Sequence, residues 1–170
     1  MRKSRSGFTI VELLIVVVVI AILAAISIVA YTGIQNRAND SRRLQDIASI
    51  RKALDIYKVN NGRYPIAQAN PGINAWEVSV DPNFLSSLNN VASAMPTDPK
   101  NTTDHYYAYY RYSAGSNGCP SSAGNYYVLR IVGLESADGT EVSDLGVCTS
   151  ITGVSRIPTA TQAVFVGFEG

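Results

Sequence analysis

The amino-acid sequence predicts an α+β protein in which one long N-terminal helix is followed by a small antiparallel sheet. Residues 8–30 form an apolar run that carries a single charge, Glu12, and no proline occurs between Phe8 and Tyr64. Beyond His105, runs of alternating and aromatic residues replace the helical pattern, as is typical of strands. The 170 residues leave room for one membrane helix and one globular domain.

The apolar run is long enough to cross a membrane. A helix over residues 8–30 would measure about 35 Å, which exceeds the hydrocarbon thickness of a bilayer. An ordinary secretory signal peptide would have a shorter apolar core and a small-residue cleavage site such as Ala-x-Ala, and this run contains no Ala-x-Ala. We therefore expect residues 8–30 to be a transmembrane helix.

The single acid in this run needs a partner, because a carboxylate inside a membrane costs up to about 2.5 to 3.5 kcal/mol on insertion scales. Residues 1–7 form a basic leader with Arg2, Lys3 and Arg5. A cut after Gly7 would create a cationic amine on Phe8. At about 4 Å and an effective dielectric near 20, its attraction to the Glu12 carboxylate would be worth about 4 kcal/mol.

The N-terminus combines a basic leader, the run Gly7-Phe8-Thr9-Ile10-Val11-Glu12 and the apolar run after it. On these features it resembles the prepilin signal of type IV pilins and pseudopilins. The resemblance implies a pilin-like fold, cleavage between Gly7 and Phe8 by a prepilin peptidase, and N-methylation of Phe8. It also implies assembly of identical subunits into a helical filament through Glu12 and Phe8, with a membrane platform and an ATPase as partners. The alternative for Glu12 is a snorkelling residue in an ordinary signal anchor.

Residues 31–60 are expected to continue the helix in amphipathic form. Ile47, Ile50, Leu54 and Tyr57 recur on one helical stripe, whereas Arg43 is expected to lie off it. The sequence Asn60-Asn61-Gly62, followed by Pro65, predicts the end of the helix. The segment from residue 46 to 65 also resembles the helix exit of major pseudopilins and Gram-positive-type pilins.

Residues 61–104 are expected to form an irregular connecting region. A short helix is predicted after Asp81-Pro82, with Phe84, Leu85 and Leu88 on its buried side. The turn Pro96-Thr97-Asp98-Pro99 resembles the one that precedes the sheet in pseudopilins.

Residues 105–170 are expected to form an antiparallel sheet of three or four strands with a disulfide loop. In the strand of residues 105–112, the face with Tyr107, Tyr109 and Arg111 is predicted to point outward. In the strand of residues 125–135, Arg130 is predicted outward and Tyr127, Leu129 and Ile131 inward. Residues 146–151 and 163–168 are candidate edge strands.

Cys119 and Cys148 are the only cysteines, and both lie in the part that we expect to be exported. In an oxidising compartment such a pair predicts a disulfide, with two free thiols as the alternative.

The sequence offers little support for catalysis or for a cofactor. His105, the only histidine, is predicted to be a surface strand residue, and no nucleophile or phosphate-binding motif appears. Asp138, Glu141 and Asp144 could supply oxygen ligands to calcium, which major pseudopilins bind near their C-terminus, but their spacing differs from that of an EF-hand. Removing the three basic side chains of the leader changes the formal charge of +1 to −2, which gives no electrostatic case for nucleic-acid binding.

The sequence therefore predicts a structural subunit of a type IV pilus-like filament. It would be a single-pass membrane protein, with its leader in the cytoplasm and its domain outside, until it joins a cell-surface filament. A secretion or competence pseudopilin is the alternative within this class. A monomeric, signal-anchored extracellular binding module is the alternative from another class.

Overall fold

The computed structural model describes residues 7–68, 76–136, 143–144, 146–148 and 161–169 of the chain. It divides into two compact units, one that ends at Ala38 and one that begins at Asn39. Helix α1 (Ile10–Asn61) contributes residues to both units.

Helix α1 ends where the local chemistry of the sequence predicts. The N–H of Gly62 donates to the carbonyl oxygen of Lys58 at 2.7 Å, and Gly62 has a φ of +74°. Glycine adopts this left-handed conformation without the steric cost of a Cβ atom, which is why it commonly follows the last helical residue. The predicted stop is confirmed, and the 52 residues of α1 agree with the expected length of about 50.

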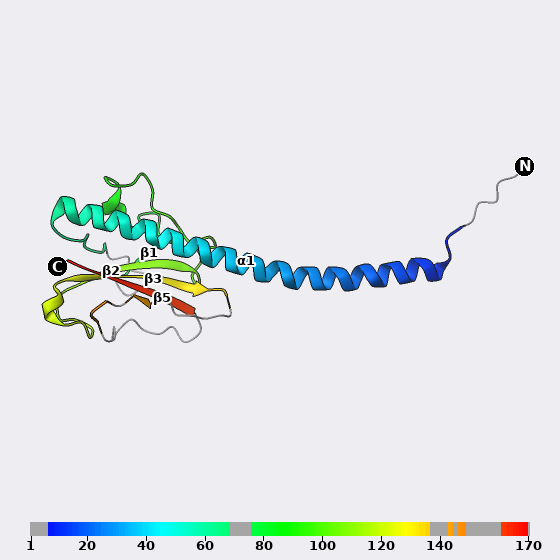
Figure 1. Ribbon diagram of the computed structural model, residues 1–170. Helices are drawn as coiled ribbons and strands as arrows, with labels where there is room; N and C mark the ends of the chain where they lie inside the picture. The colour runs from blue at the N-terminus through cyan, green and yellow to red at the C-terminus, as the bar shows by residue number, and fades with distance from the viewer. Residues whose placement is uncertain (1–6, 69–75, 137–142, 145, 149–160, 170) are drawn as a thin grey trace, which may run out of the picture. The chain divides into compact units, whose positions relative to one another are not determined.

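Five strands form one sheet in the order β1-β2-β3-β5-β4. Figure 1 labels β1, β2, β3 and β5. The three long strands are β2 (Tyr106–Tyr112), β3 (Tyr126–Leu134) and β5 (Thr161–Phe168), whereas β1 (Glu77–Val78) and β4 (Ser143–Asp144) are short. Neighbouring strands are antiparallel except for β4 and β5, which are parallel. The expected α+β class is confirmed.

Strand β5 corrects one expectation from the sequence. Residues 163–168 do form a strand, but this strand lies between β3 and β4 and not at an edge. Ala163 and Phe165 contact one hydrophobic cluster and Val166 contacts the other, so both faces of β5 are covered. In the second candidate edge strand, residues 146–148 form a turn, and residues 149–151 lie outside the described residues.

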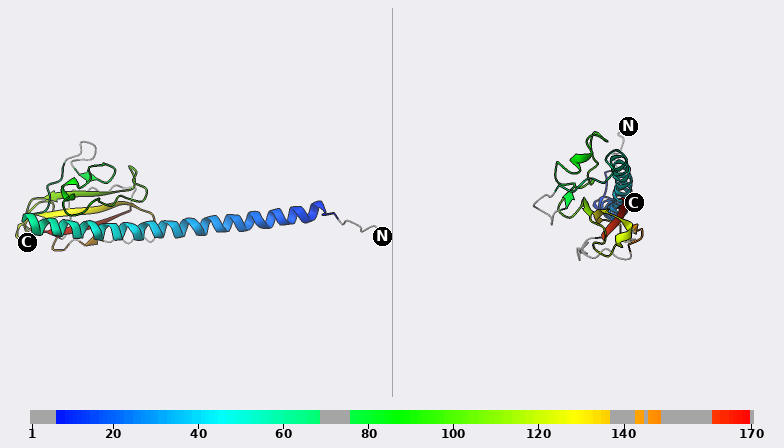
Figure 2. Two further views of the ribbon diagram at one scale, coloured as in Figure 1. Left: turned by 90° about the horizontal axis from the view of Figure 1, so that it is seen from above. Right: turned by 90° about the vertical axis from the view of Figure 1, so that its left-hand side faces the viewer.

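The main core lies between the sheet and the part of α1 that belongs to the second unit, and Figure 2 shows that part of α1 alongside the strands. Ile47, Ile50 and Leu54 of α1 are fully or almost fully buried. They share a cluster with Tyr127, Leu129 and Ile131 of β3, as predicted.

Strand β2 packs the opposite way from the expectation. Tyr107 and Tyr109 are fully buried in the main core, whereas their face was predicted to point outward. Their hydroxyl groups are satisfied inside the protein, since Tyr107 donates to Asp46 at 2.9 Å and Tyr109 to the carbonyl oxygen of Pro65 at 2.6 Å. Arg111 does not force this face into solvent, because it lies near the end of β2, where its guanidinium reaches Glu169.

The other face of the sheet carries a second hydrophobic cluster. It includes Trp76, Tyr106, Tyr126 and Val128. Arg130 lies on this face, as predicted, but it is only 5% exposed because its guanidinium stacks at 4.3 Å on the ring of Trp76. Burial lowers the pKa of Arg130.

The connecting region is more ordered than its composition suggests. Asp81 accepts a hydrogen bond from the N–H of Asn83 at 2.8 Å and starts a series of turns. The 3₁₀ helix η1 (Ser86–Leu88) follows, and Phe84, Leu85 and Leu88 are buried, as predicted. Strand β1 also comes from this region.

Candidate functional site

The first candidate site is the start of helix α1, where Glu12 has a partner within its own chain. One Glu12 carboxylate oxygen accepts from the backbone N–H and from the hydroxyl of Thr9, both at 2.8 Å. The N–H of Glu12 in turn donates to the Thr9 hydroxyl oxygen at 3.3 Å. This reciprocal pattern is a capping box, which satisfies N–H groups that the first turn of a helix leaves without partners.

The apolar part of α1 is exposed along its length in the isolated chain. The large side chains that are exposed before the second unit include Phe8 at 87%, Ile10, Leu14, Ile20, Leu23 and Val29. By length and composition, α1 is suited to cross a membrane. An exposed apolar surface of this extent is typical of a segment that contacts a membrane or another protein.

The predicted cleavage position is open to solvent. Gly7 and Phe8 both precede the first helical residue and are exposed, and an added Cβ atom on Gly7 would meet nothing within 4 Å. The bond between them is therefore in a non-helical segment that an enzyme could bind.

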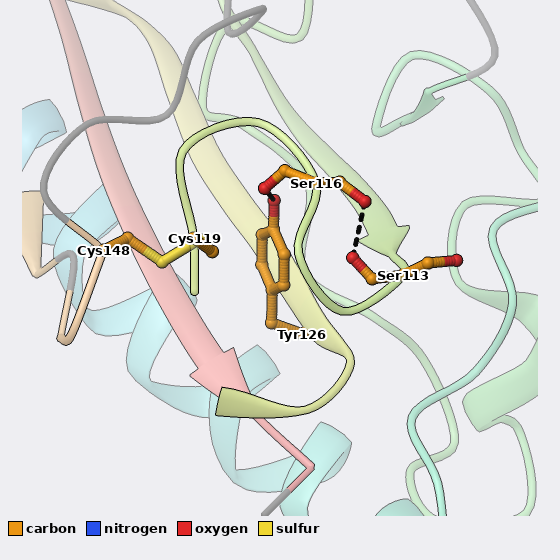
Figure 3. Close-up of a disulfide and its surroundings, with 5 residues drawn as sticks. All are labelled: Ser113, Ser116, Cys119, Tyr126 and Cys148. Carbon is orange, nitrogen blue, oxygen red and sulfur yellow. Dashed lines mark hydrogen bonds between the residues drawn. A yellow bond between two sulfur atoms is a disulfide. The ribbon is translucent and has the colours of Figure 1, made fainter. Parts of the chain in front are cut away.

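The two cysteines form the expected disulfide (Figure 3). Cys119 lies in the connection between β2 and β3, and Cys148 follows β4 in sequence. Tyr126, beside the disulfide in Figure 3, donates its hydroxyl hydrogen to the carbonyl oxygen of Ser116 at 2.8 Å. The disulfide thus ties the loop after β2 to the turn after β4.

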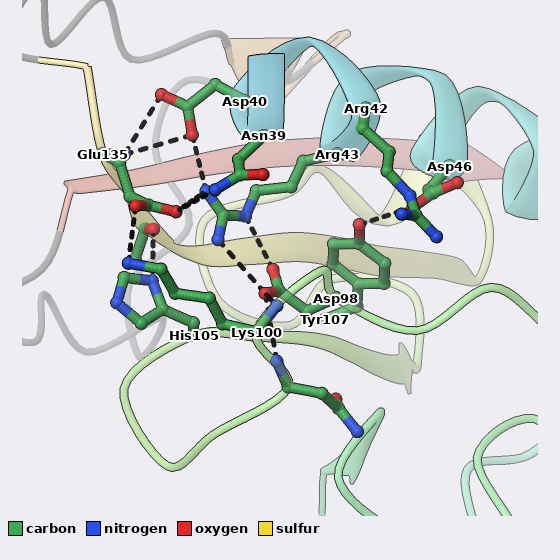
Figure 4. Close-up of polar contacts among 12 residues, drawn as sticks. Asn39, Asp40, Arg42, Arg43, Asp46, Asp98, Lys100, His105, Tyr107 and Glu135 are labelled. Atoms are coloured by element: carbon green, nitrogen blue, oxygen red, sulfur yellow. Dashed lines mark hydrogen bonds and ion pairs between the residues drawn. The ribbon is translucent and has the colours of Figure 1, made fainter. Parts of the chain in front are cut away.

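A second candidate site is a buried network of charges around Arg43, which the sequence did not predict (Figure 4). The Arg43 side chain is 0% exposed. Its guanidinium contacts three carboxylates: Asp98 at 2.7 Å through Nε, and Asp40 at 2.7 Å and Glu135 at 2.8 Å through Nη1. Lys100 adds a second cation, with its Nζ 2.6 Å from Glu135.

The carboxylates of this network also bind backbone groups. Asp98 accepts from the N–H of Lys100 at 2.8 Å, and Asp40 accepts from the N–H of Ser136 at 2.7 Å. The network therefore joins the start of the second unit in α1 to the turn before β2 and to the end of β3. We refer to Asp40, Arg43, Asp98, Lys100 and Glu135 as the Arg43 network.

The pKa values of its acids reflect this pairing. Burial alone would raise the pKa of Asp98, but the hydrogen bonds from Arg43 and from two backbone N–H groups outweigh it, and the pKa lies below its ordinary value. The pKa values of Asp40 and Glu135 are lowered in the same way, because burial is again outweighed by hydrogen bonds. All three acids are thus held in their charged form.

The position of Arg43 could have been found from the helical repeat. Arg43 precedes Ile47 by four residues and Ile50 by seven, so it lies on the buried stripe. The prediction that Arg43 lies off this stripe is therefore wrong. The partner of Arg43 could not be predicted, because nothing in the local sequence indicates that Asp98, 55 residues away, would contact it.

A third polar cluster lies at the other end of the sheet, around Glu169. Arg111 donates to Glu169 through Nε at 2.6 Å and through Nη2 at 2.8 Å. Asn125 and the backbone N–H of Tyr64 also donate to this carboxylate, both at 2.9 Å. Although burial opposes the effect, these bonds lower the pKa of Glu169 to about 2.

The remaining predicted residues take no part in these clusters. His105 precedes β2 and is partly buried, with its Nδ1 at 2.6 Å from the carbonyl oxygen of Gly133, so it is not a simple surface residue. Asp138 and Glu141 lie outside the described residues, and Asp144 belongs to β4. Within the part of the chain that the structure describes, no group of three or more His, Cys, Asp or Glu residues could hold a metal ion.

The fold and the N-terminal site together define a class of protein. Its members have an apolar N-terminal helix with one acid near its start and a small α+β unit built on the later part of that helix. Residues 2–28 match the prokaryotic N-terminal methylation motif, and residues 30–148 match type II secretion system protein G. Because the second match covers more than half of the chain, the chain belongs to the type II secretion system protein G family.

Individual relatives agree with this family. The chain is 34% identical over 67 residues to the type II secretion system core protein G of Aeromonas hydrophila, a match that covers 39% of this chain and 47% of that protein. It is 39% identical over 67 residues to the Pseudomonas aeruginosa protein, with the same shares covered. With the core protein G of Escherichia coli it shares 30% identity over 99 residues, which cover 56% of this chain and 67% of that protein.

The first of these matches spans about half the length of the relative. No solved structure matches the chain. The family match ends at Cys148, so strand β5 lies beyond it. The resemblance of the N-terminal signal to that of pilins and pseudopilins is confirmed.

Proposed function

We propose that this chain is a structural, non-catalytic subunit of a pilus-like filament that operates in type II secretion. The observation that carries the proposal is the exposed apolar part of α1, which bears one acid and belongs to a unit separate from the globular one. A helix of this kind can be held first by lipid and then by identical helices in a filament core.

Processing would begin at the exposed Gly7–Phe8 bond. A prepilin peptidase on the cytoplasmic side would remove the leader with Arg2, Lys3 and Arg5, and the new amine of Phe8 would be methylated. The match of residues 2–28 to the methylation motif supports this step. The basic leader supports an orientation with the leader in the cytoplasm and the globular unit outside.

Glu12 would then set the register between subunits. In the precursor, its carboxylate is engaged by Thr9 of the same chain at 2.8 Å. A carboxylate has more acceptor sites than these two bonds occupy, so Glu12 can keep the capping box and also accept the Phe8 amine of a neighbouring copy. That attraction, about 4 kcal/mol at a dielectric near 20, is comparable to the insertion penalty of the acid.

Assembly would transfer each subunit from the membrane to the filament. A membrane platform and an ATPase, the partners that the resemblance to pilins and pseudopilins implies, would drive this step. Within the class, the family match and the turn at Asp98 favour a secretion pseudopilus over a long adhesive pilus.

Mass spectrometry and filament sedimentation test the proposal together. The mature chain should begin at methyl-Phe8, and filaments should sediment from sheared cells. Glu12→Gln should be cleaved normally but should yield less than a tenth of the sedimented subunit, because the amine then lacks its counter-charge. Thr9→Ala is the matched control, since it removes the hydroxyl that bonds Glu12 but leaves the backbone N–H of residue 9 and the Glu12 carboxylate, and it should retain most of the filament yield.

Two results would contradict the proposal. One is an intact leader on a monomeric membrane protein, which is the outcome expected of a signal-anchored binding module. The other is a filament yield for Glu12→Gln equal to that of the unmodified chain.

A further inference from the structure

The connecting region contains a cleft that the filament role does not use. Its volume is about 470 Å³, within the range of about 300 to 1,000 Å³ that small-molecule sites occupy. It is formed within residues 79–101, by the turns that follow β1, the 3₁₀ helix η1 and the chain that leads to β2. None of the acids and bases of the Arg43 network lines it.

Neutral groups dominate the polar lining of the cleft. These polar residues include Asn83, Ser86, Asn89, Ser93, Thr97 and Asn101. Amides and hydroxyls can both donate and accept hydrogen bonds. Asp81 is the one charged residue in the lining, and the lining contains no lysine, arginine or histidine.

This lining excludes two classes of ligand. Phosphates and other anions are bound by arginine, lysine or clustered backbone N–H groups, and a lone carboxylate would repel them. A single carboxylate is also too few anionic ligands for a calcium site. The amides and hydroxyls of the lining instead suit a neutral ligand that is rich in hydroxyl groups.

The apolar part of the lining fits the same class. Phe84, Met95, Val80 and Pro82 line the cleft together with the polar groups. A sugar ring presents hydroxyls at its rim and C–H groups on its faces, so it needs polar and apolar contacts side by side. A peptide that binds by adding a strand would instead need an open strand edge, whereas the cleft is lined by turns.

The walls of the cleft are held in place by the core. Leu85 and Leu88 are fully buried, and Leu85 has a φ of +50°, an uncommon conformation for a residue with a branched side chain. Ser79 accepts from the N–H of Tyr107 at 3.0 Å and donates to the Asn101 side-chain oxygen at 2.8 Å. The side-chain amide nitrogen of Asn101 therefore has a fixed orientation, which reduces the ordering cost of binding.

We propose that this cleft binds a neutral saccharide, as a terminal or internal unit of a polysaccharide outside the membrane. The proposal is independent of filament formation, since no residue of the N-terminal site lines the cleft.

The test uses the full chain in detergent micelles, with chitotriose and maltotriose as neutral probes. Saturation-transfer NMR should detect binding of at least one probe, and the affinity should change little between 50 and 500 mM salt because no cation contributes. Ser93→Trp places a bulky ring at an exposed wall of the cleft and should weaken binding at least tenfold. Ser49→Trp, on the exposed side of α1, is the matched control and should leave the affinity unchanged.

Two milder variants separate a loss of binding from a loss of folding. Asn83→Ala and Asn89→Ala remove exposed amides without adding bulk, and thermal unfolding should show that both remain folded. Each should weaken binding several-fold. The proposal is overturned if neither probe binds, if Ser93→Trp binds as tightly as Ser49→Trp, or if acidic saccharides or peptides bind in preference to the neutral probes.

Discussion

Replacing Arg43 tests whether the buried charge network holds the globular unit together. Arg43→Met keeps much of the side-chain volume and removes the charge. Three carboxylates with lowered pKa values would then lose their common cation in a site where Arg43 and Asp98 have side chains that are 0% exposed. Removing one partner of a buried ion pair costs about 3 to 5 kcal/mol.

The expected change is large enough to measure by thermal unfolding. For a unit of this size, such a loss lowers the melting temperature by about 10 to 20 °C. Circular dichroism of the detergent-solubilised chain should show this fall, and chemical denaturation should show a lower midpoint with an unchanged slope.

The neighbouring arginine provides the matched control. The Arg42 side chain is 66% exposed and lies 3.9 Å from Asp46, so Arg42→Met should cost less than about 1 kcal/mol. Asp98→Asn combined with Arg43→Met should be less destabilising than the sum of the single changes, because the two residues share their interaction. If Arg43→Met and Arg42→Met lower the melting temperature equally, the network does not stabilise the unit.

Three further predictions follow from contacts in the globular unit. Changing Cys119 and Cys148 to serine should cost about 3 to 4 kcal/mol of unfolding free energy, because the disulfide closes a loop across 29 residues, and thermal unfolding should show it. Gly133→Ala should destabilise the unit by about 1 to 3 kcal/mol in chemical denaturation, since Gly133 has a φ of +86° and its added Cβ atom would overlap the backbone oxygen of Asp104. The pKa of Glu169 is lowered in the folded unit, so the stability that this residue contributes should be fully present above pH 4.5 and should disappear as the pH falls toward 2. Unfolding of the unmodified chain and of Glu169→Gln, measured at several pH values, checks this prediction.

Each of these predictions has an outcome that contradicts it. Equal stability of the oxidised and reduced chain would show that the disulfide contributes nothing. Gly62→Ala serves as the comparison for Gly133→Ala, because Gly62 has a φ of +74° but nothing lies within 4 Å of an added Cβ atom. Both variants carry the backbone strain, and Gly133→Ala alone adds the steric overlap, so equal losses of stability would contradict the prediction. A Glu169→Gln chain with the same pH profile as the unmodified chain would exclude Glu169 as the titrating group.

The sequence predicted those parts of the fold that depend on neighbouring residues. The length of α1, its end at Gly62 and the buried stripe at Ile47, Ile50 and Leu54 all follow from local periodicity and turn chemistry. These features need no knowledge of distant parts of the chain.

The features that depend on distant partners were predicted less well. Arg43 was predicted to lie off the buried stripe and Arg130 to point outward, yet each is buried, one against carboxylates and the other against the Trp76 ring. Tyr107 is buried because Asp46 of α1 accepts its hydroxyl hydrogen, a pairing across 61 residues that no sequence pattern records. A charged side chain is usually exposed, but it can be buried when a distant part of the chain supplies a partner for it.

The position of β5 in the sheet means that one edge of β3 is paired by residues near the C-terminal end of the given sequence. β5 follows β4 in the chain, yet it is inserted between β3 and β4, and within the described residues it is the strand that pairs with β4. The edge of β3 that β5 covers therefore has no strand partner until the residues up to Phe168 have been synthesised. An exposed strand edge can pair wrongly, so this edge of β3 is open to mispairing until β5 forms.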